Sequence, residues 1–424
     1  MEFVVHGGVP RITFHNLEKL SLYYMEKLKD ITRDILLPGS LSNLRVLKVH
    51  YCPKLNITPI MQFANGLEEF EVTWYNATEI LNNSDRMVSK RTSVTMTEID
   101  KTGGGCDHAF LPRLRRLVLQ VLPQLISIWK TDSMPPLGSL SNLTELNVQY
   151  CNKLRYLLSP CLAQRLDRLE LLVIIGCDIM EKLISVEDEK VVVQSSAVAE
   201  RLTSVSFSRC ISPPYLIFGN LRELYISDCP GFCSLFSIGL AQNLMQLESL
   251  TVYRCLQMEV ILKGEDAEIE NEEESERGKR ILFPRLVKID LGYLPKLTCL
   301  CSVKGGSTNL CDGEAFTSLL LPSLENIKVE YCQQLTRLNM GSQSSQHLKL
   351  IRGSKAWFEG LVWDDENSRS HFHPLFVPSA YEFSYLGEKS SFNVERDTIV
   401  TQVPGWAKSL WNKNSHGKSM TYIN

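Results

Sequence analysis

Apolar residues recur along most of the chain in one phrase, L-x-x-L-x-V/L-x-x-C-x-x-L, and Leu44, Leu47, Val49 and Cys52 begin one copy of it. Leu47 and Val49 are two residues apart, a spacing that places both on the same face of a β-strand. One such unit cannot bury its own apolar edge, so it must stack on a neighbour. The phrase therefore predicts a row of coils that each contribute one short parallel strand.

This repeated phrase is the signature of a leucine-rich-repeat solenoid. The expected fold is an α/β repeat solenoid, a horseshoe with a concave parallel β-sheet and an irregular or short-helical convex side. About eleven units fit the pattern, including a half-repeat around Cys210, and about three are needed for a stable stack. The steps between units are unequal, so the longer steps are expected to carry loop insertions. The predicted insertions are 82–109, 186–200, 263–280 and 302–318.

Three segments are expected along the chain: repeats at 12–350, a capping segment at 351–378 and a poorly ordered tail at 379–424. In the second segment, Trp357 and Trp363 are followed by charged residues. Large aromatic side chains with a charged border suit a terminal coil that closes the core and leaves a polar outer surface.

Seven of the thirteen cysteines occupy the same slot of the repeat, namely Cys52, Cys151, Cys177, Cys210, Cys229, Cys255 and Cys332. A small side chain with a weak donor is expected to point inward there and meet the backbone of the adjacent coil. The alternatives are a disulfide set or a zinc site, but no pair has C-x-x-C spacing. His371 and His373 also lack a nearby third ligand. No metal site is predicted, and buried thiols suit a reducing compartment.

The balance of charge excludes some classes of partner. A formal net charge of -3 gives no electrostatic footprint for nucleic acid. The start of the chain has no basic stretch followed by an apolar core, and no run of eighteen apolar residues occurs, so a cytoplasmic protein without a membrane span is expected. The insertion at 263–280 holds eight acidic and four basic residues. Such a block is usually solvated, and an acidic docking arm is the alternative.

The sequence offers a binding surface and no catalytic centre. Ser, His and Asp residues are scattered without nucleophile spacing, so an enzyme is not expected, and no cofactor site is found. The side chains that alternate with the buried ones on the strands are the candidates for protein binding. Tyr225 and Tyr253 are expected to stack in register and to act as anchors. The candidates are Val46, Lys48, His50, Glu145, Asn147, Gln149, Glu223, Tyr225, Ser227, Ser249, Thr251, Tyr253, Asn326, Lys328 and Glu330.

Three further features of the chain are a strand phrase that ends in Y/D-x-C-x-x-L, a Phe/Leu-Pro-x-Leu re-entry after the acidic insertion, and an aromatic ending. In this chain they read Tyr51-Cys52-Pro53-Lys54-Leu55 and Asp228-Cys229-Pro230, Phe283-Pro284-Arg285-Leu286, and Trp357 to Trp363 with Pro374-Leu375-Phe376. Together they resemble the leucine-rich-repeat half of plant intracellular coiled-coil NLR disease-resistance proteins. The resemblance covers roughly residues 12 to 378.

The family normally carries a nucleotide-binding module ahead of the repeats, but no G-x-x-x-x-G-K-[ST] loop occurs here, so nucleotide binding is not carried over. The chain opens inside a repeat, and such a module is expected to precede it in cis. The resemblance implies a protein-recognition domain in plant defence that senses a pathogen effector or an effector-modified host protein. Two alternatives remain open. One is the substrate receptor of a ubiquitin ligase, although no F-box-like segment is seen, and the other is a truncated relic without independent activity.

Overall fold

The structure of the protein is a computed structural model. The residues that it describes are 3–5, 14–32, 39–81, 109–129, 136–185, 217–264, 279–302, 318–340, 346–363 and 366–379. The four predicted insertions, the half-repeat around Cys210 and the predicted tail lie wholly or almost wholly outside these residues.

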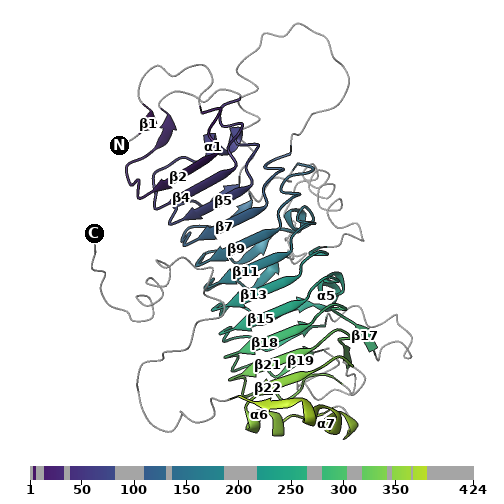
Figure 1. Cartoon of the computed structure of the whole chain (residues 1–424). Helices are drawn as coiled ribbons and strands as arrows, with labels where there is room; N and C mark the ends of the chain where they lie inside the picture. The colour runs from purple at the N-terminus through teal and green to yellow at the C-terminus, as the bar shows by residue number, and fades with distance from the viewer. Residues whose placement is uncertain are drawn as a thin grey trace, which may run out of the picture. The chain divides into compact units, whose positions relative to one another are not determined.

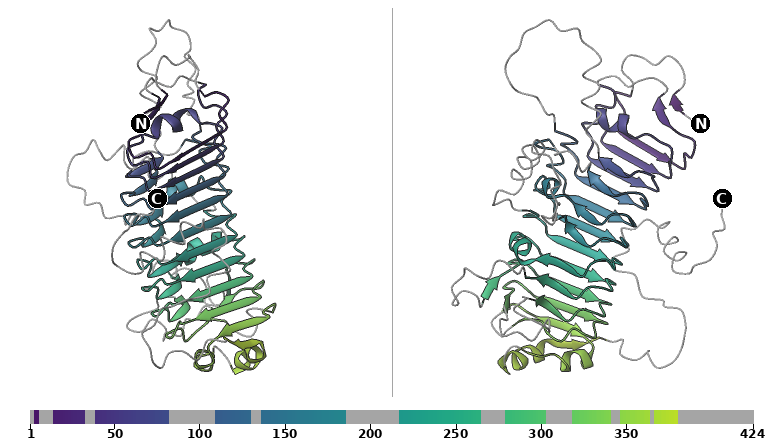
Figure 2. Two further views of the ribbon diagram at one scale, coloured as in Figure 1. Left: turned by 60° about the vertical axis from the view of Figure 1, so that its left-hand side comes forward. Right: turned by 180° about the vertical axis from the view of Figure 1, so that it is seen from behind.

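One parallel sheet of twelve strands runs through the described part of the chain, and its strand order follows the sequence. Every neighbouring pair is parallel and in register (Figures 1 and 2). The strands are β2 (Lys19–Tyr23), β4 (Val46–His50), β5 (Glu69–Thr73), β7 (Arg116–Gln120), β9 (Glu145–Gln149), β11 (Leu171–Ile175), β13 (Glu223–Ser227), β15 (Ser249–Tyr253), β18 (Lys288–Gly292), β21 (Asn326–Glu330), β22 (Leu350–Gly353) and β23 (Phe376–Pro378). The predicted leucine-rich-repeat solenoid is confirmed.

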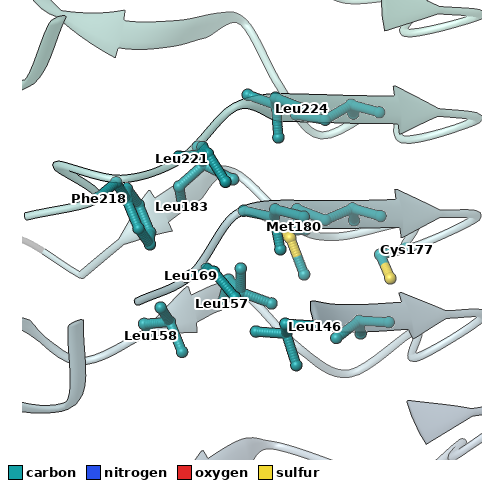
Figure 3. Packing of buried hydrophobic residues seen from close by; sticks show 14 of the residues in the cluster. Leu146, Leu157, Leu158, Leu169, Cys177, Met180, Leu183, Phe218, Leu221 and Leu224 are labelled. Carbon is teal, nitrogen blue, oxygen red and sulfur yellow. The ribbon is translucent and has the colours of Figure 1, made fainter. Parts of the chain in front are cut away.

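The core lies directly behind this sheet and is built from equivalent positions of successive coils. Leu146, Leu172 and Leu224, each the second residue of its strand, pair in register and are at most 1% exposed. Figure 3 shows such residues packed between the main sheet and the opposite side of the coils. Because each leucine contacts the coil before and after it, shortening one to alanine would cost about 2–5 kcal/mol of stability.

The opposite side of the coils carries short helices, as expected, and also short parallel ladders. The ladders pair β1 (Phe3–Val5) with β3 (Asp30–Thr32), β6 (Glu79–Leu81) with β8 (Ser127–Trp129), β10 (Tyr156–Leu158) with β12 (Lys182–Ile184), β17 (Lys279–Ile281) with β20 (Ser318–Leu320), and β14 (Ser234–Ser237) with β16 (Val260–Lys263) and β19 (Cys299–Ser302). The helices on this side are α1 (Thr58–Phe63), α3 (Pro160–Ala163) and α5 (Ile238–Asn243).

The last two of the twelve strands, β22 and β23, carry the main sheet into the segment that was predicted to cap the stack. Here Phe358 stacks on Phe376 with ring centroids 4.1 Å apart, and Trp363 stacks on Phe372 at 5.4 Å. Phe358 and Phe372 are buried in the hydrophobic core, and Trp363 and Phe376 pack against it. The elements that carry or flank them are α6 (Lys355–Glu359), α7 (Glu366–Phe372) and the 3-10 helix η1 (His373–Leu375).

The unit around Cys210 was expected to be one of the stacked coils. In the structure β11 pairs directly with β13 through five residue pairs, so no other strand lies between these two.

The six described slot cysteines are buried free thiols. Their sulfurs approach the carbonyl oxygen two residues earlier, as between Cys229 and Ser227 at 3.2 Å. The expected contact with a neighbouring coil also occurs, because the Cys177 amide donates to the Cys229 sulfur at 3.4 Å. Burial raises the pKa of the Cys151 thiol to about 12, which makes it a poor nucleophile at neutral pH. These features fit a structural role.

Candidate protein-binding surface

The surface of the main sheet that faces away from the core is formed by the first, third and fifth residues of the strands, and is called the outward face below. Side chains alternate along a strand, so these positions point away from the buried second and fourth residues. The structure places all fifteen predicted binding residues at these positions. They come from β4, β9, β13, β15 and β21.

Exposure differs sharply among the fifteen residues. Four of them are buried by neighbouring side chains: His50, Gln149, Ser227 and Thr251 are at most 9% exposed. Glu223 is exposed, and the remaining ten are partly exposed. The surface that a partner could reach is therefore concentrated at the first and third strand positions.

The predicted stacking of Tyr225 and Tyr253 is wrong. Tyr225 is the third residue of β13 and pairs with Thr251, whereas Tyr253 is the fifth residue of β15 and pairs with Ser227. The two tyrosines are thus displaced by two residues along neighbouring strands. Residue type alone did not reveal this offset, because it depends on where each strand begins.

Tyr253 is held in a polar cluster that crosses three strands. Its hydroxyl donates to Asp290 Oδ1 at 2.7 Å and accepts from Lys328 Nζ at 3.3 Å. Lys288 Nζ lies 3.3 Å from Asp290 Oδ2, and the Asp290 side chain is almost fully buried. Burial and the nearby Asp290 charge raise the pKa of Tyr253, so its phenol stays protonated as the donor.

A second polar cluster lies on β4 and β5. Lys48 Nζ is 2.8 Å from Glu71 Oε2, and His50 Nε2 is 3.4 Å from Glu71 Oε1. The His50 ring also stacks on Tyr23 with centroids 4.8 Å apart. Burial lowers the pKa of His50, which favours the neutral imidazole near pH 7. Tyr23, Lys48, His50 and Glu71 come from three successive coils, so their side chains meet only when the coils stack.

Sequence reasoning missed a row of turn residues at the end of the strands. The residue after each of ten main-sheet strands, from β2 to β21, has a positive φ, and only Gly176 among them is glycine. Each of the first nine donates its amide to a carbonyl of the next coil, as Tyr51 does to Thr73 at 2.9 Å. The nine residues of this row that are not glycine are Tyr24, Tyr51, Trp74, Val121, Tyr150, Asp228, Arg254, Tyr293 and Tyr331. The recurrence of an aromatic residue just before the Cys slot was the available signal.

Other kinds of site find no support in the described part of the chain. Within it, no group of three or more His, Cys, Asp or Glu side chains is arranged to hold a metal ion. None of the described helices has the length and apolar character that crossing a membrane requires.

Comparison with known proteins assigns the family. The model of the RPS2-like leucine-rich repeats of plant disease resistance proteins matches residues 16–178 and 206–350, more than half of the chain. The chain belongs to this RPS2-like family. The segments matched by the family model include every strand of the main sheet from β2 to β21, and they end at the first residue of β22.

Two relatives of this RPS2-like chain come from Arabidopsis thaliana. Disease resistance protein RPS5 is 29% identical over 178 residues, which is 41% of the present chain and 17% of RPS5. Disease resistance protein At4g27190 is 26% identical over 215 residues, which is 47% of the present chain and 20% of that protein. The alignments thus span a fifth or less of these curated relatives. The chain is a leucine-rich-repeat region of the plant disease resistance type.

Proposed function

We propose that the outward face is a protein-recognition surface in plant defence, which senses a pathogen effector or a host protein that an effector has modified. The observation that carries this proposal is the in-register array of outward side chains on the sheet of an RPS2-like repeat domain. A rigid array loses little conformational entropy when a partner binds, so more of the contact energy appears as affinity.

Three related proposals concern the protein in its cell. In the receptors that the chain resembles, the repeats act together with a nucleotide-binding module in cis, and recognition would change the restraint that the repeats place on it. The buried free thiols in the repeat slot fit a reducing compartment and thus the cytoplasm. Family membership favours this defence role over that of a ubiquitin-ligase receptor.

The test is co-purification of the full chain with proteins from infected plant tissue. Lys48→Glu alters the outward face on β4, whereas Lys54→Glu makes the same charge change at an exposed residue of the following turn. A specific partner should be lost with Lys48→Glu and kept with Lys54→Glu. Thermal unfolding should show that both variants remain folded. A partner that withstands Lys48→Glu and Lys328→Glu together would contradict the proposal.

A further inference from the structure

Strand β11 differs from the other strands in what it presents on the outward face. Its first, third and fifth residues are Leu171, Val173 and Ile175. All three are partly exposed and do not belong to the hydrophobic core cluster of the described residues. The core therefore does not explain why this strand is apolar on both faces.

A tyrosine on β13 and another directly after β9 enlarge this apolar area. Tyr225 pairs in register with Val173. Tyr150 lies against the backbone of Gly176, where an added Cβ would be 2.5 Å from the ring Cδ1. Together, Leu171, Val173, Ile175, Tyr225 and Tyr150 form the feature that we call the apolar stripe.

The two ends of the apolar stripe differ in charge. At one end, Leu171 pairs in register with Glu145 on one side and Glu223 on the other. Glu145 is bound by Arg116 at 2.9 Å, whereas the exposed Glu223 has no ion-pair partner within the described ranges. This end therefore carries an uncompensated negative charge.

At the other end of the apolar stripe the charges are compensated. Asp228 follows β13, and both of its carboxylate oxygens accept hydrogen bonds from Arg254, at 2.6 and 2.9 Å. A charged group of a partner would gain little there. The attraction that remains is for a positive charge beside Glu223.

We propose that the apolar stripe binds an amphipathic segment of a protein partner, which packs apolar side chains on Val173 and places a lysine or arginine beside Glu223. This inference rests on the proposed function, because it specifies the chemistry of the partner that the outward face recognises. Burial of aliphatic and aromatic area supplies affinity. The unpaired carboxylate selects the sign of the flanking charge and the direction in which the segment lies.

A random-peptide display library selected on the purified full chain provides the probe. The enriched peptides should combine apolar residues with a lysine or arginine close by. For one synthesised peptide, Val173→Glu and Glu223→Lys should each weaken binding about tenfold or more in fluorescence polarisation, which corresponds to about 1.4 kcal/mol. Lys54→Glu, which changes the charge at an exposed turn residue outside the outward face, should leave the affinity unchanged.

Val173→Thr keeps the shape and strand preference of valine, so it reports on the stripe if Val173→Glu fails to fold; it should weaken binding by a smaller factor. Enrichment of peptides without the apolar and basic pattern, or unchanged affinity in the stripe variants, overturns the inference. Self-association of the chain that Val173→Thr abolishes overturns it too, because the occupant is then a second copy.

The same peptides separate this inference from the proposed function. Suppose that binding is lost with Asn326→Glu or Lys328→Glu but kept in the stripe variants. This result would overturn the inference that the apolar stripe binds the peptide, and the outward face would remain the binding surface. Binding that withstands every substitution on the outward face would contradict both.

Discussion

The ring of Tyr253 lies directly over Gly292 on the neighbouring strand, so closely that a Cβ added to Gly292 would be 2.3 Å from the ring Cε1. The two residues pair in register across β15 and β18. This contact lets the Tyr253 hydroxyl reach Asp290 on the same neighbouring strand. The absence of a side chain at position 292 is thus a condition for the polar cluster on this part of the outward face.

Gly292→Ala should displace the Tyr253 ring and break its hydrogen bond to Asp290. We expect the free energy of unfolding to fall by about 1–3 kcal/mol, because the added methyl group overpacks the site. Urea unfolding of both proteins measures this difference. Gly239→Ala on α5 is the matched control, because no atom lies within 4 Å of its added Cβ. Equal stability of wild-type protein and Gly292→Ala would show that the ring does not occupy this position.

Tyr253→Phe should remove one hydrogen bond from the nearly buried Asp290 and one from Lys328. The expected loss is about 1–2 kcal/mol, since a buried acceptor is left with fewer partners. Thermal or urea unfolding measures it. Tyr24→Phe serves as the control, because the Tyr24 side chain is 74% exposed and should tolerate the change. Loss of the same size in both variants would argue against a specific role of the Tyr253 hydroxyl.

Acidification should destabilise the protein in part through His50. Burial holds the pKa of His50 below its ordinary value of 6.5, so the unfolded chain takes up this proton at a higher pH than the folded one. Its contribution to stability is complete above pH 6.5 and is lost as the pH falls from there through the folded pKa. His50→Gln should flatten the pH dependence of the free energy of unfolding in this window. A variant with the wild-type pH profile would contradict the assignment.

Thiol reactivity should separate the slot cysteines from an exposed one. Cys233 is exposed, whereas Cys151 is buried with its pKa raised to about 12. Iodoacetamide near neutral pH should therefore modify Cys233 in the folded protein and Cys151 only after unfolding. Peptide mass spectrometry assigns the label to each site, and labelling in urea is the control. Equal rates at the two sites in the folded protein would disprove the buried-slot description.

The spacing of apolar residues was sufficient to predict the main sheet and its core. Leu146 and Leu172 occupy the same place in the repeated phrase, and they became neighbours in one buried column. This succeeded because a coil that cannot bury its own leucines has to stack on a coil with the same pattern. The alternation along each strand likewise placed all fifteen candidate residues on the outward face, although their binding role stays a prediction.

The sequence did not predict contacts that depend on the alignment of neighbouring coils. Tyr225 and Tyr253 look equivalent by residue type, yet their strands place them two residues apart. The apolar outward residues of β11 were also overlooked, because Leu171, Val173 and Ile175 read as part of a continuous apolar run that suits a buried strand. Only the paired strands show which of these side chains face away from the core.

By itself, the sequence determined that the chain is a leucine-rich-repeat stack, because the repeat period and the apolar slots are local properties of the chain. The tertiary structure decided which outward side chains meet. It brought Tyr253 over Gly292, bound Asp228 to Arg254 and left Glu223 without an ion-pair partner among the described residues. The physical reason is that these relationships join residues of different coils, and their distance is set by strand register and by the path of the connections between coils.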